Sequence, residues 1–139
     1  MWLAQQGFAT TAIDREPSVV AALDARARRE GLPLTALAMD LESVVGVTLG
    51  EGAYDVVVEV HYLHRSLFPA LLAALRPGGV LVYETFTVAQ AARGRPTNPA
   101  FLLEPGELPR LVAPLAVVAA REGDYEGRMV SSVVAVRQA

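Results

Sequence analysis

Short β-rich runs alternate with amphipathic helical stretches along the 139-residue chain, and this alternation restricts the fold more than any other feature. The order is strand, helix, strand, a linking stretch, strand, helix and strand, followed by a loop, a short helix and two further β-rich runs. Strands that are separated by helices pair in parallel, because the crossover helix returns the chain to the same end of the sheet. The sequence therefore predicts an α/β fold with a mostly parallel sheet.

Two predicted strands flank a predicted helix in the N-terminal part of the chain. Residues 8–13 and residues 34–39 are short β-rich runs. The helix between them begins near Pro17, because proline suits a first helical turn, and it ends at Gly31, because glycine accepts the left-handed conformation of a helix cap. The two strands are expected to be neighbours in the sheet.

A valine-rich run over residues 54–60 gives the clearest strand of the chain. Valines without strict alternation are typical of a central parallel strand that is buried on both faces. Leucines at helical spacing predict a helix over residues 67–75, and a proline with two glycines predicts a sharp turn over residues 77–79. A fourth strand is expected over residues 80–83, extending as far as Phe86.

The C-terminal part of the sequence predicts a loop, a helix and a hairpin. Residues 87–104 are expected to be irregular, and residues 107–112 to form a short helix. Two β-rich runs, residues 115–121 and residues 129–137, are joined by a glycine-containing stretch, which is typical of an antiparallel hairpin. A long loop in a compact domain commonly has a functional role, so residues 87–104 are candidates for a lid or a substrate wall.

The composition indicates a folded protein and argues against a nucleic-acid or membrane partner. Hydrophobic residues make up 53% of the chain and charged residues 19%, which is enough apolar material for one domain over residues 1–139. The net charge of −3 argues against a nucleic-acid partner held by phosphate neutralisation. Apolar runs are far shorter than the roughly 20 residues that span a bilayer, so no membrane partner is expected and a cytoplasmic protein is predicted.

Two aspartates follow the first two predicted strands, and each has two possible roles. In open parallel sheets, ligands bind beyond the carboxyl ends of the strands. There the Asp14 carboxylate is suited to accept hydrogen bonds from two ribose hydroxyls, and Asp40 is suited to accept one from an adenine amine. The alternative for both is that they cap the backbone that follows, as aspartate often does.

Polar residues after the third and fourth strands are the catalytic candidates. His61, Tyr62 and His64 follow the third strand, and Glu84 lies at the end of the fourth. Imidazole titrates near neutral pH, so either histidine suits a base or a substrate-orienting group, although both also suit a pocket wall. Two histidines without a carboxylate or cysteine partner at fixed spacing are a weak metal signal, so no metal site is predicted. Glu84 either faces the same cleft or is a solvated glutamate.

The position of Asp14 in the chain is informative. In nucleotide-binding α/β units a glycine-rich loop lies roughly 20 residues before this acid. Only 13 residues precede Asp14, and no G-x-G-x-x-G motif occurs elsewhere. The first strand and the glycine loop are therefore expected upstream of Met1, and residues 1–6 are expected to be the end of the helix that follows such a loop.

Taken together, these features resemble the class I S-adenosylmethionine-dependent methyltransferases. The matching pieces are Met39-Asp40-Leu41, Tyr54-Asp55-Val56-Val57-Val58 and Leu75-Arg76-Pro77-Gly78-Gly79-Val80-Leu81. The last is the most specific, because the family's turn before its fifth strand is commonly L-x-P-G-G-x-L. Within the family the chain looks nearest to the bacterial tellurite-resistance-like group, on Tyr62-Leu63-His64-Arg65, Tyr83-Glu84-Thr85-Phe86 and Gly94-Arg95-Pro96-Thr97-Asn98-Pro99.

The resemblance implies a Rossmann-like sheet with a C-terminal antiparallel hairpin, in a truncated domain that lacks its first strand and glycine loop. It implies methyl transfer from S-adenosylmethionine to a small-molecule substrate. Asp14 would then hold the ribose, Arg15 would lie beside the adenine, and Asp40 and Leu41 would contact the adenine ring. The cofactor's methionine end would be lined by Glu59, Val60 and His61.

Two alternatives to an active methyltransferase remain at this point. The chain is also compatible with a non-catalytic or truncated domain that no longer binds the cofactor alone. Loss of a strand would expose sheet edges, and exposed edges pair with other chains, so a homodimer is expected. A nicotinamide-dependent oxidoreductase also places an acid after its second strand, but the Pro-Gly-Gly turn and the terminal hairpin favour the methyltransferase.

Overall fold

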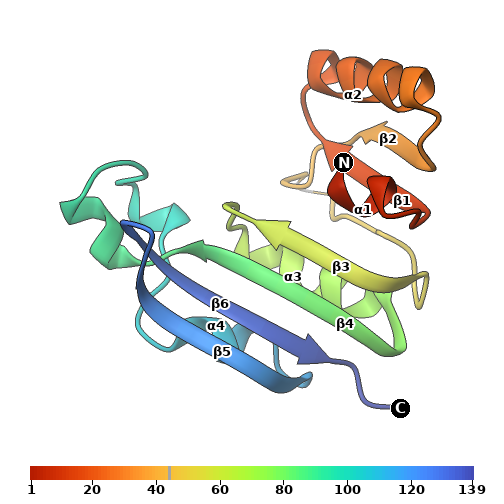
Figure 1. The fold of residues 1–139 in the computed structure, drawn as a ribbon. Helices are drawn as coiled ribbons and strands as arrows, with labels where there is room; N and C mark the ends of the chain where they lie inside the picture. Colours follow the sequence, from red (N-terminus) through yellow and green to blue (C-terminus); the bar gives the residue numbers. More distant parts are fainter. Residues whose placement is uncertain (44) are drawn as a thin grey trace. The chain divides into compact units, whose positions relative to one another are not determined.

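The computed structural model describes residues 1–43 and 45–139 of the chain. They form two compact units, Met1–Val45 and Gly46–Ala139, which are described one at a time (Figure 1). The single domain expected over residues 1–139 stays a prediction. No helix within the described residues is long and apolar enough to cross a membrane.

The unit Met1–Val45 holds a two-stranded parallel sheet and two helices. Its elements are α1 (Trp2–Gln5), β1 (Thr10–Asp14), α2 (Pro17–Glu30) and β2 (Leu34–Ala38). As predicted, α2 has proline in its first turn and is followed by Gly31, whose φ of 64° is left-handed. β1 pairs with β2 from Thr10 opposite Leu34 to Asp14 opposite Ala38, so both strands end at the same edge of this sheet.

This first unit buries few side chains. Among its described residues, Ala4 and Ala27 are fully buried, with exposed fractions of 1% and 2%. Trp2 and Phe8 are 67% and 60% exposed. The cause is architectural, because two strands and one long helix make too few layers to enclose large apolar side chains.

The unit Gly46–Ala139 is built on a four-stranded sheet with the strand order β3-β4-β6-β5. The strands are β3 (Tyr54–Val60), β4 (Leu75–Phe86), β5 (Ala116–Tyr125) and β6 (Arg128–Val136). β3 pairs with β4 in parallel, whereas β6 pairs with β4 and with β5 in antiparallel fashion. The predicted hairpin is confirmed, but β5 is longer than expected, and the turn between the strands is only Glu126 and Gly127.

Helices cover one face of the four-stranded sheet. After β3 come η1 (Arg65–Leu67) and α3 (Phe68–Ala74), and after β4 come η2 (Val88–Ala92), η3 (Pro99–Phe101) and α4 (Glu107–Leu111). α3 contacts β3 and β4, and α4 contacts β6, on the side of the sheet that lies behind it in Figure 1. The core lies between these layers and includes Leu71, Leu81, Tyr83, Leu108, Val112 and Val133, each at most 3% exposed.

The other face of this sheet, here called the open face, has no helix of the same unit over it. Strand alternation and the pairing registers place on it Val56, Val58, Val60, Val82, Glu84, Ser132, Val134 and Arg121. Val56, Val58 and Val60 are 44%, 45% and 51% exposed. The prediction that this strand is central and buried on both faces is therefore wrong for its own sheet, where β3 is an edge strand covered on one face.

The predicted Pro-Gly-Gly turn is a bulge within β4. Tyr54 pairs with Leu75 and Val56 pairs with Val80, so a single residue of β3 faces four residues of β4. At Gly79 a Cβ would lie 2.8 Å from the Arg76 carbonyl oxygen and 3.2 Å from that of Tyr54, so only glycine is accommodated. The motif allows the chain to leave α3 and enter β4 directly beside β3.

Two adjacent valines of β6 provide a test of this layering. Val133 is 2% exposed in the core, and Val134 is half-buried on the open face. We expect Val133→Ala to lower the free energy of unfolding by about 2 kcal/mol and Val134→Ala by less than about 1 kcal/mol, because only the first leaves a cavity. Urea denaturation of both variants measures the difference, and equal losses would contradict an open face.

Candidate functional site

The carboxyl ends of β3 and β4 bring several of the predicted residues together. The parallel register places Val60 opposite Glu84, and the backbone N–H of His61 donates to the Glu84 carbonyl oxygen at 2.8 Å. His61 has a φ of 59°, a left-handed conformation that costs a non-glycine residue about 1–2 kcal/mol. Its ring stacks on Phe86 with centroids 4.7 Å apart. Strain of this kind concentrates at functional sites, so His61 stays a strong candidate.

Glu59 and Tyr83 meet on the helix-covered face of the same strands. They are paired across β3 and β4. Burial raises the pKa of Glu59 to about 7. Burial also raises the pKa of Tyr83, whose hydroxyl therefore stays protonated and donates to the Tyr62 carbonyl oxygen at 2.6 Å. This bond and the stacking of Tyr83 on Phe68, with centroids 5.0 Å apart, hold the segment that follows β3.

Glu84 lies on the open face and is held by two donors. The Ser132 hydroxyl donates to its carboxylate, and Arg121 donates to the same oxygen at 3.1 Å. The Ser132 hydrogen bond, with help from Arg121, lowers the pKa of Glu84. Glu84 is thus a fixed, ionised acceptor rather than a solvated glutamate, and a carboxylate of low pKa is a weak general base at neutral pH.

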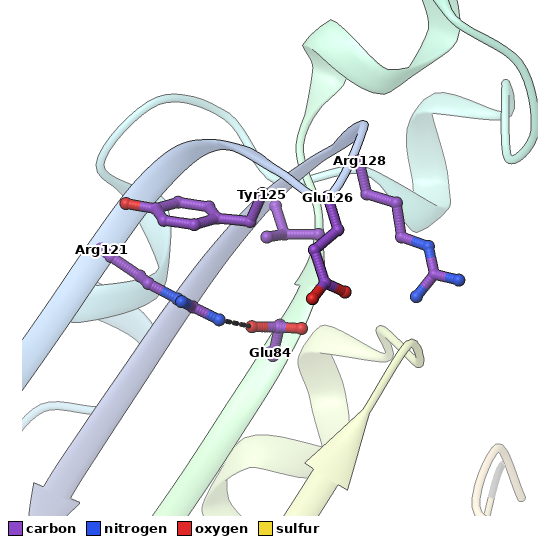
Figure 2. A pocket seen from close by; sticks show the side chains of 6 residues that line it. Glu84, Arg121, Tyr125, Glu126 and Arg128 are labelled. Carbon is purple, nitrogen blue, oxygen red and sulfur yellow. Dashed lines mark hydrogen bonds and ion pairs between the residues drawn. The ribbon is translucent and has the colours of Figure 1, made fainter.

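A hollow of about 330 Å³ opens beside Glu84 at the turn of the β5–β6 hairpin (Figure 2). It is lined by Glu84, Arg121, Tyr125, Glu126, Arg128 and Val130. The Arg121 guanidinium lies over the Tyr125 ring, 4.1 Å from its centroid. Apart from Glu84, none of these residues was predicted from the sequence, where residues 122–127 read as a connection between strands.

Arg65 is a positioning residue that the sequence did not reveal. Its guanidinium donates to both carboxylate oxygens of Glu107, at 2.6 and 2.9 Å, and to the carbonyl oxygens of Ala100 and Leu102, at 3.2 and 2.9 Å. The hydrogen bond from Arg65 also lowers the pKa of Glu107. This bidentate pair ties the segment after β3 to the start of α4 across 42 residues of sequence, and no local spacing rule predicts it.

The predicted loop over residues 87–104 is more ordered than expected. It contains η2 and η3, and Thr87 and Leu103 form an isolated parallel bridge. Gln90 is 7% exposed, and its amide donates to the Arg95 carbonyl oxygen at 3.2 Å while accepting from the Met129 N–H at 2.9 Å. Buried backbone anchors on both sides make this segment a fixed wall in the described structure, and its proposed role as a lid stays a prediction.

In the first unit, Asp14 ends β1 and Asp40 follows β2, at one edge of their sheet. One carboxylate oxygen of Asp14 accepts from the Glu16 N–H at 2.9 Å, and one of Asp40 accepts from the Glu42 N–H at 3.0 Å. Both side chains thus cap the backbone that follows them, which is the alternative role predicted for them from the sequence. Each carboxylate still has a second oxygen, which has no hydrogen bond within the described residues, so neither reading excludes the other.

The predicted site residues therefore fall into two groups, one in each unit. The first unit carries Asp14, Arg15, Asp40 and Leu41, and the second carries Glu59, Val60, His61, Tyr62, His64 and Glu84. His64 is half-buried at the start of η1, where its carbonyl oxygen accepts from the Leu67 N–H at 2.9 Å. Within the described residues, no three histidine, aspartate or glutamate side chains are arranged to hold a metal ion.

Comparison with known proteins shows similarity at the level of structure. No protein-family model matches the chain, and no curated protein matches it in sequence. TehB from Haemophilus influenzae superposes with a TM-score of 0.78 at 16% identity, over 99% of this chain and 52% of TehB. The Burkholderia thailandensis 1,6-didemethyltoxoflavin-N1-methyltransferase, solved with S-adenosylhomocysteine bound, gives a TM-score of 0.69 at 20% identity, over 99% of this chain and 65% of that protein.

The comparisons show the fold and not the activity. The [4+2]-cyclase SpnF has a TM-score of 0.72 at 15% identity, over 92% of this chain and 65% of that protein. One fold thus accompanies proteins named for different reactions, as is common for α/β folds. The predicted Rossmann-like α/β fold is confirmed, and the chain shares it with proteins described as S-adenosylmethionine-dependent methyltransferases.

The raised pKa of Glu59 predicts a particular pH dependence of stability. Its pKa rises from 4.5 to about 7 on folding, so the folded state loses stability as the pH rises from about 4.5 to 7. We expect the free energy of unfolding to fall by roughly 2–3 kcal/mol over this window in the wild type, and Glu59→Gln to remove most of that fall.

Urea denaturation between pH 4.5 and pH 8 without ligand measures both proteins. Glu51→Gln is the matched control, because Glu51 is an exposed glutamate of the same unit. A slope in Glu59→Gln as steep as in the wild type would contradict the buried, near-neutral carboxyl.

Proposed function

We propose that this chain binds S-adenosylmethionine and serves methyl transfer to a small-molecule acceptor. The observation that carries the proposal is the agreement of fold, over 99% of the chain, with a methyltransferase that holds S-adenosylhomocysteine. The similarity to TehB supports the finer proposal of kinship with the bacterial tellurite-resistance-like methyltransferases. Non-catalytic use of the same fold is the alternative, and cofactor binding is the first test between them.

The residues at the strand ends suit an adenosine group and a methionine group. Asp14 is exposed at the end of β1, with one carboxylate oxygen still able to accept from ribose hydroxyls. Asp40 presents the same arrangement one strand later for the adenine amine, beside Leu41, and Arg15 lies next to Asp14 in the chain. In the second unit, Glu59 and Val60 end β3 and His61 follows it, where the resemblance assigns the methionine end.

When bound, the cofactor would supply a sulfonium methyl group to an attacking nucleophile. The contribution of the chain is alignment, since orientation of donor and acceptor dominates this kind of reaction. The exposed imidazole of His61, fixed by its backbone bond to Glu84 and by stacking on Phe86, is the proposed acceptor of a proton from the nucleophile. Tyr62 and His64 are proposed to border the same end of β3.

Replacement of Asp14 tests the adenosine assignment directly. We expect the chain to bind S-adenosylhomocysteine and Asp14→Asn to bind it about 10–100-fold more weakly, because hydrogen bonds to a charged acceptor contribute about 1.5–3 kcal/mol. Isothermal titration calorimetry measures both affinities.

Asp24→Asn is the matched control, because Asp24 lies on α2 and pairs with Arg28 at 2.9 Å, away from the strand ends. Absence of binding by the wild type at millimolar ligand would overturn the proposal for this chain. Preferential binding of NADH would favour the oxidoreductase instead.

We also propose that the chain forms a homodimer through its sheet edges. β3 is an edge strand whose outer side pairs with no described residue, and three of its valines, Val56, Val58 and Val60, are 44–51% exposed. An exposed apolar edge is a template for pairing with another strand. We expect a dimer in light scattering and a shift toward monomer in Val58→Lys, since a lysine on such an edge disfavours pairing. A monodisperse wild-type monomer would contradict this.

A further inference from the structure

The hollow at the β5–β6 turn is polar, and its charged groups come from three strands and the turn. Glu84 comes from β4, Arg121 and Tyr125 from β5, Glu126 from the turn and Arg128 from the start of β6. Its volume of about 330 Å³ is at the small end of the range for small-molecule sites. A metabolite-sized ligand therefore suits it better than a polymer.

Two of these charges already satisfy each other. Arg121 donates to Glu84 at 3.1 Å, lies over the Tyr125 ring, and comes within 3.5 Å of the Ser132 hydroxyl, which itself donates to Glu84. This group of side chains forms a prearranged wall, because each polar atom is fixed by a neighbour. Its net charge is close to zero.

The other two charges have no such partners. Within the described residues, the side chains of Glu126 and Arg128 make no hydrogen bond or ion pair, and both residues are exposed. Figure 2 shows the Glu126 carboxylate directed toward that of Glu84, with Arg128 on the side away from Arg121. The hollow thus offers one uncompensated negative group beside one uncompensated positive group.

The backbone at Glu126 is a second, independent observation. Glu126 and Gly127 have φ values of 55° and 79°, so the turn is of the two-residue kind that requires left-handed conformations at both central residues. Asparagine or glycine is favoured at the first of these positions, and glutamate is not. A strained residue whose side chain enters a hollow points to a role for that side chain.

From this arrangement we infer that the hollow binds a small zwitterion that carries both an ammonium and a carboxylate group. Glu126 and Glu84 receive the ammonium group, and the Arg128 guanidinium receives the carboxylate. Both contacts are charge-assisted hydrogen bonds, the strongest kind available on an exposed surface. That the bound amine is also the methyl acceptor rests on the proposed function, in which His61, whose backbone N–H donates to the Glu84 carbonyl oxygen, lies beside a residue that lines the hollow.

The binding test uses the whole chain without cofactor, at low ionic strength, with NMR detection at Tyr125 and at the neighbouring backbone. The probes are glycine, β-alanine and γ-aminobutyrate, which differ in charge separation, and the single-charge analogues butylamine and butyrate. We expect one of the three amino acids to bind at least about fivefold more tightly than either analogue, because it engages both groups.

Variants assign each charge to its partner. Glu126→Gln is expected to weaken the best amino acid and butylamine by about tenfold, and Arg128→Gln is expected to weaken the amino acid and butyrate while leaving butylamine unchanged. The controls Glu51→Gln and Arg29→Gln change exposed groups elsewhere and should bind as the wild type does. Glu126→Asn should raise the melting temperature, because asparagine suits the turn, and still lose affinity.

Several outcomes would overturn the inference. They are the absence of chemical-shift changes with all three amino acids, equal losses in the control variants, and unchanged affinity in Glu126→Asn. The proposed function is tested separately by S-adenosylhomocysteine. A chain that binds γ-aminobutyrate but not that ligand would keep the zwitterion site and lose the methyltransferase proposal, and the reverse result would do the opposite.

Discussion

The parallel register between β3 and β4 determines where the candidate groups of the second unit lie. It pairs Val56 with Val80 and Val60 with Glu84, and it is reached across a bulge that only a glycine at position 79 allows. A shift by one residue would move every side chain of β3 to the opposite face. His61 would then lose its backbone bond to Glu84 and its stacking on Phe86. The close approach at Gly79 is thus a structural requirement of the site and not only a turn signal.

The same register places the carboxylates of Glu59 and Glu84 on opposite faces of one sheet, where their surroundings shift the two pKa values in opposite directions. Glu59 lies on the helix-covered face, where burial raises its pKa to about 7. Glu84 lies on the open face, where the Ser132 hydroxyl and Arg121 lower its pKa. Two acids with divergent pKa values suit different tasks. Glu59 is able to exchange a proton near neutral pH, whereas Glu84 is suited to remain charged and to orient its neighbours.

Local signals predicted the elements well, because each depends on residues close in sequence. Pro17 and Gly31 bounded α2, and the valine run gave β3 with its observed ends. The pair between Arg65 and Glu107 and the hollow at the hairpin were missed, because both join residues that only the tertiary fold brings together. The two glycines within residues 122–127 led to the prediction that the whole stretch connects the two strands. In the structure four of these residues continue β5, and the turn is formed by the other two.

The one wrong expectation about burial still contains information about the open face. A valine-rich strand without alternation predicts cover on both faces, and the second unit covers only one of them. Val56, Val58 and Val60 continue across the sheet into Val82 and Val134, so the apolar character belongs to several strands and not to one chance residue. Contiguous apolar surface of this kind is typical of a region that another element or chain covers. The polar end of the same face, at Glu84 and Arg121, is where the hollow begins. Cover over the valines would therefore leave the proposed ligand site open while it removes apolar surface from water.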